Sequence, residues 1–97
     1  MKILIHLHTG SELMSFEAIS LGFVLASFDH HVQFYLSGDS RDVLSDPTSR
    51  LYGMIQSLSL YDIPKAWADF DVPDTLASFF EPLDFDKTDD FDTRLTF

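Results

Sequence analysis

The feature that most constrains the fold of this 97-residue chain is a compact apolar run at Lys2–His8, which ends at a Thr9-Gly10 turn signal. Such a run, followed at once by a turn, is typical of a strand that is buried on both faces. Strands of this kind belong to parallel sheets, because the helices that connect parallel strands also cover the sheet. The start of the chain therefore favours an α/β fold.

The signals after this strand alternate between helix and strand. Thr9 and Glu12 match a capping box, which makes Thr9 the predicted N-cap of a helix that ends near Phe28. The later segments predict, in order, a strand at 32–36, a helical turn at 39–44, a helix at 47–60, a strand at 63–68, a brief helical segment from 73, and strands at 79–80 and 93–97. This alternation predicts one domain over residues 1–97, whose mostly parallel sheet of about five strands is covered on both sides.

Cysteine is absent from the sequence, although 45% of the residues are hydrophobic and can form a core. Its absence excludes disulfides, thiolate metal sites, iron–sulfur clusters and cysteine nucleophiles. A covalent sulfur intermediate cannot form on this chain.

The charge balance is strongly acidic, with 16 acidic residues against 6 basic ones and a formal net charge of −10. A nucleic-acid backbone would be repelled by that field, so we expect no direct nucleic-acid partner. The longest hydrophobic stretch, Leu21–Phe28, is far shorter than the roughly 20 residues that cross a bilayer, and no targeting segment is visible. These patterns predict a cytoplasmic protein without a membrane partner.

Apolar residues occupy two sides of the first predicted helix. At 100° per residue, one stripe gathers the predicted core residues Met14, Ala18, Leu21, Leu25 and Phe28. The opposite side gathers Phe16, Ile19 and Phe23. Neighbouring loops could cover this second cluster, but exposed apolar clusters usually mark protein–protein interfaces, and an interface is the interpretation we favour.

Two histidines on the first strand are the only residues there that could bind a metal. His6 and His8 share one face because they lie two residues apart, yet a metal site needs a further ligand and no acid has a diagnostic spacing. We therefore expect hydrogen-bonded histidines and no metal. The Thr9-Gly10-Ser11 turn lacks both a P-loop and a dinucleotide fingerprint, so no cofactor is predicted.

A ten-residue motif at 54–63, Met-Ile-Gln-Ser-Leu-Ser-Leu-Tyr-Asp-Ile, is followed by Trp67. It resembles the DsrE/DsrF-like sulfur-relay family, and within it the TusC (DsrF) branch. In that branch an apolar helix runs into a Leu-Tyr-Asp-Ile turn, here Leu60, Tyr61, Asp62 and Ile63, and then into a short strand that contains a tryptophan. The apolar first strand and the closing segment Asp92–Phe97 are similar to the ends of these proteins.

The resemblance implies a three-layer α/β/α subunit that assembles with TusB-like and TusD-like partners, typically as a dimer of heterotrimers. Such an assembly takes persulfide sulfur from a TusA-like carrier and passes it to a TusE-like one, for 2-thiolation of the wobble uridine in tRNA. In the related TusD branch a cysteine near the third strand holds the sulfur. The matching segment here, 65–68, reads Lys-Ala-Trp-Ala and has no thiol, which agrees with the non-catalytic TusC branch.

Two other functions are compatible with the sequence. The first is a stand-alone, homo-oligomeric α/β protein that binds a small ligand near His8 and Thr9. The second is a metal-dependent hydrolase that uses His6 and His8.

Overall fold

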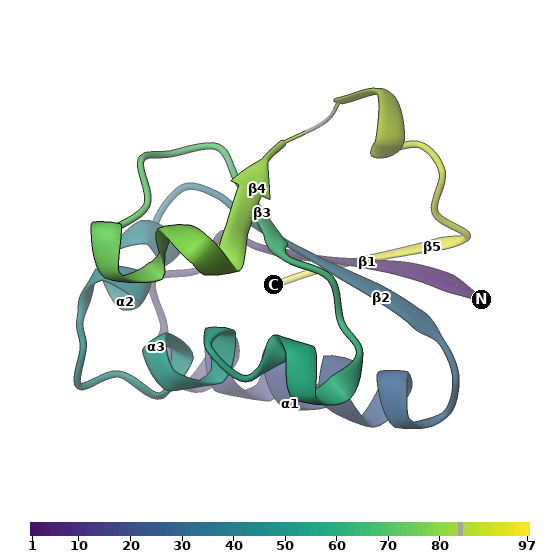
Figure 1. Cartoon of the computed structure of the whole chain (residues 1–97), viewed down its shortest axis with the longest axis horizontal. Helices are drawn as coiled ribbons and strands as arrows, with labels where there is room; N and C mark the ends of the chain where they lie inside the picture. The colour runs from purple at the N-terminus through teal and green to yellow at the C-terminus, as the bar shows by residue number, and fades with distance from the viewer. Residues whose placement is uncertain (84) are drawn as a thin grey trace.

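The computed structural model describes residues 1–83 and 85–97, which form a five-stranded sheet (Figure 1). The strands are β1 (Lys2–Leu7), β2 (His31–Leu36), β3 (Ala66–Ala68), β4 (Phe80–Pro82) and β5 (Thr93–Thr96). They lie in the order β4-β3-β2-β1-β5, and every neighbouring pair is parallel. The expected α/β fold with a parallel sheet of about five strands is therefore confirmed.

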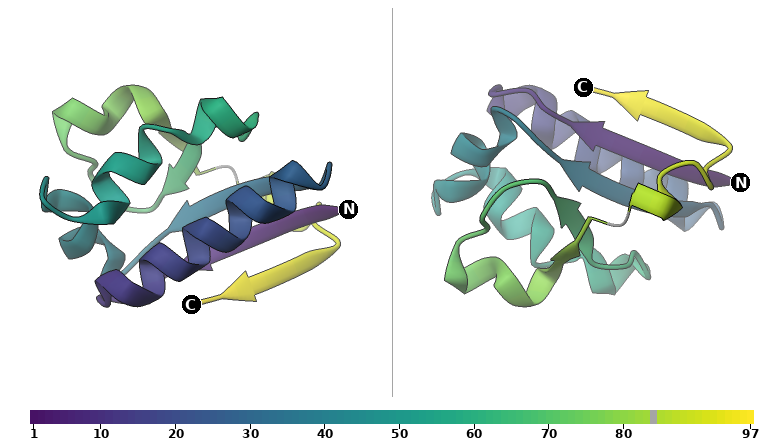
Figure 2. Two further views of the ribbon diagram at one scale, coloured as in Figure 1. Left: turned by 90° about the horizontal axis from the view of Figure 1, so that it is seen from below. Right: turned by 90° about the horizontal axis from the view of Figure 1, so that it is seen from above.

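The helices lie mainly on one face of the sheet. They are α1 (Glu12–Ser27), α2 (Ser40–Ser45), α3 (Arg50–Ile55) and the 3₁₀ helices η1 (Leu58–Tyr61), η2 (Asp74–Phe79) and η3 (Phe85–Lys87). Figure 2 (right) looks onto the other face, where η3 and its flanking segments lie in front of the strands and α1 lies behind them. The described part of the chain thus covers this second face only with the connection from β4 to β5. Only residues 83–92 separate β4 from β5, fewer than a full helical crossover needs.

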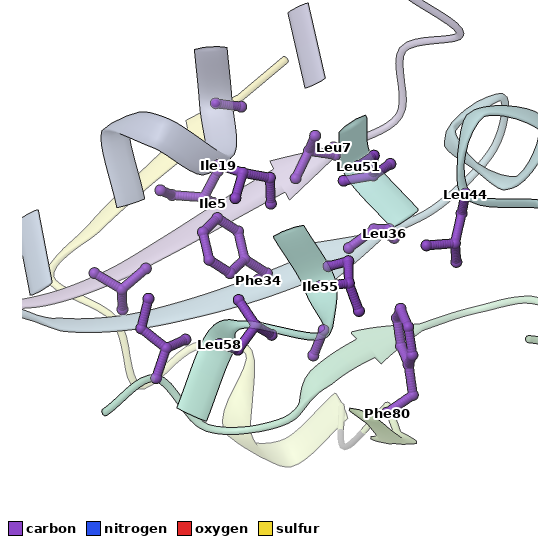
Figure 3. Packing of buried hydrophobic residues seen from close by; sticks show 14 of the residues in the cluster. Ile5, Leu7, Ile19, Phe34, Leu36, Leu44, Leu51, Ile55, Leu58 and Phe80 are labelled. Carbon is purple, nitrogen blue, oxygen red and sulfur yellow. The ribbon is translucent and has the colours of Figure 1, made fainter. Parts of the chain in front are cut away.

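The core lies between the sheet and the helical layer (Figure 3). Alternate residues of β1 and β2 point to this side, and the register pairs Ile5 with Phe34. Both side chains are fully buried. The fully buried apolar side chains that surround them include Leu7, Ile19, Leu36, Leu44, Leu51, Ile55 and Leu76.

The helix α1 begins two residues later than the capping box predicted. Ser11 is its N-cap, and the Ser11 hydroxyl accepts a hydrogen bond from the Met14 amide at 3.2 Å. Thr9 lies in the turn before the helix, where its amide donates to the Phe97 carbonyl and its hydroxyl accepts from the Ser11 amide. The predicted end is confirmed, since Phe28 is the C-cap.

Three further predicted boundaries were wrong for local reasons. The helix expected at 47–60 is divided into α3 and η1, and α3 begins only after Ser49, whose hydroxyl accepts from the Tyr52 amide. The strand expected at 63–68 is limited to β3, because Pro64 has no amide hydrogen to donate to a neighbouring strand. The fourth strand, expected at 79–80, is β4 at 80–82 instead.

The buried face of α1 differs from the predicted core stripe. The helix buries Ser15, Ala18, Ile19 and Gly22, whereas Met14, Leu21 and Phe28 are exposed. These four positions follow the i, i+3, i+4, i+7 spacing of a helix face, but two of them are not apolar, so hydrophobicity alone missed them. Gly22 brings the helix against the sheet, since a Cβ there would lie 2.2 Å from Phe34 Cζ.

Candidate functional site

A shallow apolar groove runs between α1 and the α3–η1 segment, on the outer side of the helical layer. It holds about 390 Å³ and is lined mainly by Phe16, Phe23, Met54, Leu60 and Tyr61, together with Arg50. The ring of Phe23 stacks on that of Tyr61, with centroids 4.0 Å apart and planes 4° from parallel. Two of the predicted interface residues therefore meet four residues of the 54–63 motif in one place: Met54, Ser57, Leu60 and Tyr61.

The third predicted interface residue, Ile19, does not belong to this groove. Its side chain has no exposed surface and packs in the core, so the expectation that it is exposed was wrong. The reason is again the close approach of α1 at Gly22, which turns Ile19 toward the sheet. Phe16 and Phe23 are half-buried beside it. Leu60 supplies the exposed apolar surface that was expected from Ile19, because 80% of the area of Leu60 is exposed.

Arg50 places a positive charge in this groove. Its guanidinium carbon lies 4.9 Å from the centre of the Phe16 ring, within the range of a cation–π interaction. Its backbone amide donates to the Glu12 carboxylate at 3.2 Å, which ties the start of α3 to the start of α1. The groove is therefore apolar with one fixed cation, on a chain that is otherwise acidic.

The last residues of the motif, Asp62 and Ile63, and the tryptophan that follows it lie outside the groove. Asp62 adopts the left-handed conformation, with φ of 57°, and ends η1 by donating its amide to the Leu58 and Ser59 carbonyls. Ile63 is buried in the core. Trp67 points to the opposite face of the sheet, where its indole N–H donates to the Glu81 carboxylate at 3.1 Å.

A cleft of about 370 Å³ adjoins Trp67 on that opposite face, near the amino ends of the strands. The rings of Phe91 and Trp67 pack in a T-shaped arrangement, with centroids 6.0 Å apart. His30 also lines the cleft, and among the described residues its Nδ1 atom is buried without a hydrogen-bond partner. Trp67 is only 4% exposed, so it serves mainly to pack the β4–β5 connection onto the sheet.

A separate polar cluster lies on this face toward the carboxyl ends of β1, β2 and β3, and Arg94 reaches it from the second position of β5. We call it the His6 cluster: His6, His8, Tyr35, Ser37, Asp69 and Arg94. The two ring nitrogens of His6 are both hydrogen-bonded, Nε2 to the Ser37 hydroxyl at 2.6 Å and Nδ1 to the Arg94 guanidinium at 3.2 Å. Because an arginine can only donate, Nδ1 accepts and Nε2 carries the proton. His6 is thus held as a neutral imidazole.

Aromatic packing and charge complete the His6 cluster. The ring of His6 stacks on Tyr35 at 4.3 Å and 7°, and the Tyr35 hydroxyl donates to the Asp69 carboxylate at 3.4 Å. The pKa of His6 lies below its usual value, mainly because of burial and then because of the Arg94 charge. The pKa of Tyr35 is raised, mainly by burial and then by Asp69.

The lowered pKa of His6 makes stability depend on pH. An unfolded histidine takes up its proton near 6.5, whereas the folded one does so only at lower pH. The contribution of neutral His6 to the free energy of unfolding is therefore complete above pH 6.5. It is lost as the pH falls through the pKa of His6 in the folded protein. We expect the urea midpoint to drop less between pH 7.5 and 5.5 in His6→Gln than in the wild type. An equal drop in both proteins would contradict this assignment.

Two further observations concern metals and membranes. Both nitrogens of His6 are occupied, and residues 1–83 and 85–97 contain no group of three or more histidine or carboxylate side chains placed to hold a metal ion. Within the same ranges, no helix has the length and apolar character needed to cross a bilayer.

Of the His6 cluster, the sequence indicated only the two histidines as candidates. Ser37 and Asp69 directly follow predicted strands, which was a signal that they lie at the carboxyl edge. No protein-family model matches the sequence, and no curated protein matches it significantly. Membership of the DsrE/DsrF-like family thus stays a prediction that rests on the motif at 54–67.

Proposed function

We propose that this protein is a non-catalytic structural subunit of a TusBCD-like sulfur-relay complex that supports 2-thiouridine formation in tRNA. The observation that carries the proposal is the groove between α1 and η1, where the motif residues Leu60 and Tyr61 meet Phe16 and Phe23. The motif that suggested the family therefore contributes directly to the surface that we assign to partner binding.

The absence of a thiol assigns the chemistry to a partner. In β3, Ala66 and Ala68 stand on either side of Trp67, and an alanine side chain cannot hold sulfur. A TusD-like chain would carry the reactive cysteine, while this chain would hold that partner in place. The net charge of −10 agrees with this division, because it disfavours direct contact with tRNA.

The groove has the composition of a subunit contact. Leu60 and Tyr61 are 80% and 41% exposed, and complete burial of a side chain of this kind contributes about 1.5–3 kcal/mol. Arg50 adds a cation that an acidic residue of the partner could pair with. A small domain gains stability when a partner covers such a surface.

The test is co-expression with TusB-like and TusD-like chains, followed by native mass spectrometry. We expect a hetero-oligomer that Leu60→Lys weakens at least about tenfold, because the lysine would place a charge in an apolar contact. Leu13→Lys is the matched control, since Leu13 is also an exposed leucine on the helical layer but does not line the groove. It should leave the complex intact.

A sulfur-labelling arm separates the proposal from its alternatives. With a cysteine desulfurase and labelled cysteine, reducible label should appear on the TusD-like chain and not on this one. Failure to form any hetero-oligomer, together with a stable homo-oligomer, would favour the stand-alone ligand-binding protein. Equal complex formation by Leu60→Lys and Leu13→Lys would show that the groove is not the contact.

A further inference from the structure

The His6 cluster lies where the strand order of the sheet reverses. From β1 the chain proceeds through β2, β3 and β4 in one direction, whereas β5 lies on the other side of β1. In open parallel sheets, ligands bind at the carboxyl ends of the strands at this reversal point. His6 lies one residue before the end of β1, and Arg94, which pairs with Leu4 on the adjacent strand β5, reaches His6 by a hydrogen bond of its side chain. Figure 2 (right) shows that, within residues 1–83 and 85–97, no helix lies over β1 and β5 on this side.

The hydrogen-bond partner of Arg94 is unexpected in a chain with 16 acidic residues. Its side chain is exposed, and among the described residues its hydrogen-bond partner is a neutral imidazole rather than a carboxylate. A guanidinium has five N–H donors in a planar fork, and the bond to His6 uses one of them. Ser37 and the stacked Tyr35 fix His6 in turn, so the arginine is held by a rigid support.

Two more polar side chains share this face with Arg94. Thr96 pairs with His6 in the parallel register and is exposed, and His8 is exposed with its ring 5.7 Å from that of His6. Asp69 brings a negative charge to the cluster, through the hydrogen bond from Tyr35 and through its charge near His6. A guanidinium fork, a hydroxyl and an imidazole form a donor set that suits oxygen anions.

We propose that the His6 cluster binds a small oxyanion, with Arg94 as the main donor and Thr96 and His8 beside it. The bound oxygens would take the arginine donors that His6 leaves open. The anion would also offset the Arg94 charge beside His6, so His6 would become easier to protonate and binding would strengthen as the pH falls. This inference is independent of the groove, which lies on the other face, so each proposal can fail alone.

The experiment follows the imidazole resonances of the histidine-labelled chain by NMR. Sodium sulfate and sodium acetate are added in separate titrations, with sodium chloride as the control at matched ionic strength. We expect saturable shifts at His6 and His8 and an upward shift in the pKa of His6. His31, at the amino end of β2, serves as the internal reference, and its resonances should show no saturable shift with anion concentration. The two anions report whether the site prefers a tetrahedral or a carboxylate oxyanion.

Three variants test the roles of the charges. Arg94→Gln should weaken sulfate or acetate binding at least about tenfold, and Arg94→Lys, which keeps the charge without the fork, should also weaken it. Asp69→Asn should strengthen binding about twofold, because it removes a repulsive charge but keeps an acceptor for Tyr35. Shifts that do not saturate, that match those of His31, or that persist in Arg94→Gln would overturn the proposal. Weaker binding by Asp69→Asn would overturn it as well.

Discussion

Replacing Ile19 with lysine is expected to unfold the isolated chain, whereas replacing Val24 with lysine should leave it folded. Both residues are β-branched and lie on α1, but Ile19 has no exposed surface and Val24 is 52% exposed. A lysine at 19 would bury an unpaired charge at a cost of several kcal/mol. That cost is comparable with the total stability of a domain of this size, about 5–15 kcal/mol.

Far-UV circular dichroism and urea unfolding measure this contrast directly. The Ile19 variant should lose most of its helical signal at pH 7, and the Val24 variant should keep a urea midpoint close to that of the wild type. A folded Ile19→Lys protein would mean that this side of α1 is open to water, as the sequence pattern had suggested. The assignment of Ile19 to the core would then be wrong.

The second large effect is expected at Gly22. A Cβ at this position would lie 2.2 Å from Phe34 Cζ and 3.2 Å from Ile5 Cδ1, and both side chains are fully buried. Gly22→Ala should therefore destabilise the fold by about 1–3 kcal/mol through overpacking, even though alanine is the better helix former. In a domain of this size that corresponds to a melting temperature at least about 4 °C lower.

Gly53 provides the matched control for this substitution. It lies inside α3, and a Cβ there would meet nothing within 4 Å. Gly53→Ala should raise stability by about 0.5–1 kcal/mol, because alanine restricts the unfolded chain and favours the helix. Opposite signs for the two glycines in a thermal melt support the close packing of α1 on the sheet. A stabilising Gly22→Ala would contradict it.

The parts of the fold that the sequence could predict are those set by local pattern. Apolar runs with turn signals located β1 and β2, and their alternation with helices predicted the parallel sheet. The orientation of α1 could not be predicted in this way, because it depends on how closely the helix approaches Phe34. Small residues such as Ser15 and Gly22 permit that approach. A pattern based on apolar residues does not select them as part of the buried face.

In the candidate sites too, the sequence could locate single residues by a local pattern but not the contacts between them. Phe16 and Phe23 were found because they lie together on a helix face, and Tyr61 because it lies in a motif, but no periodicity predicts that Phe23 stacks on Tyr61. The contact between Arg94 and His6 could not be predicted from the sequence, for a different reason. It depends on β5 pairing with β1 across 88 residues of sequence, which only the tertiary fold determines.

That pairing also determines the order in which the fold can be completed during synthesis. β1 aligns Ile3 with Thr93, and the amide of Asp92 donates to the Lys2 carbonyl. At about 5–20 residues per second, the ribosome needs roughly 5–20 s to make the residues that separate these partners. Throughout that interval β1 has an unpaired edge that a second nascent chain could join. β5 covers this edge of β1 and becomes the outer strand of the sheet, with Arg94 and Thr96 as its exposed side chains near His6.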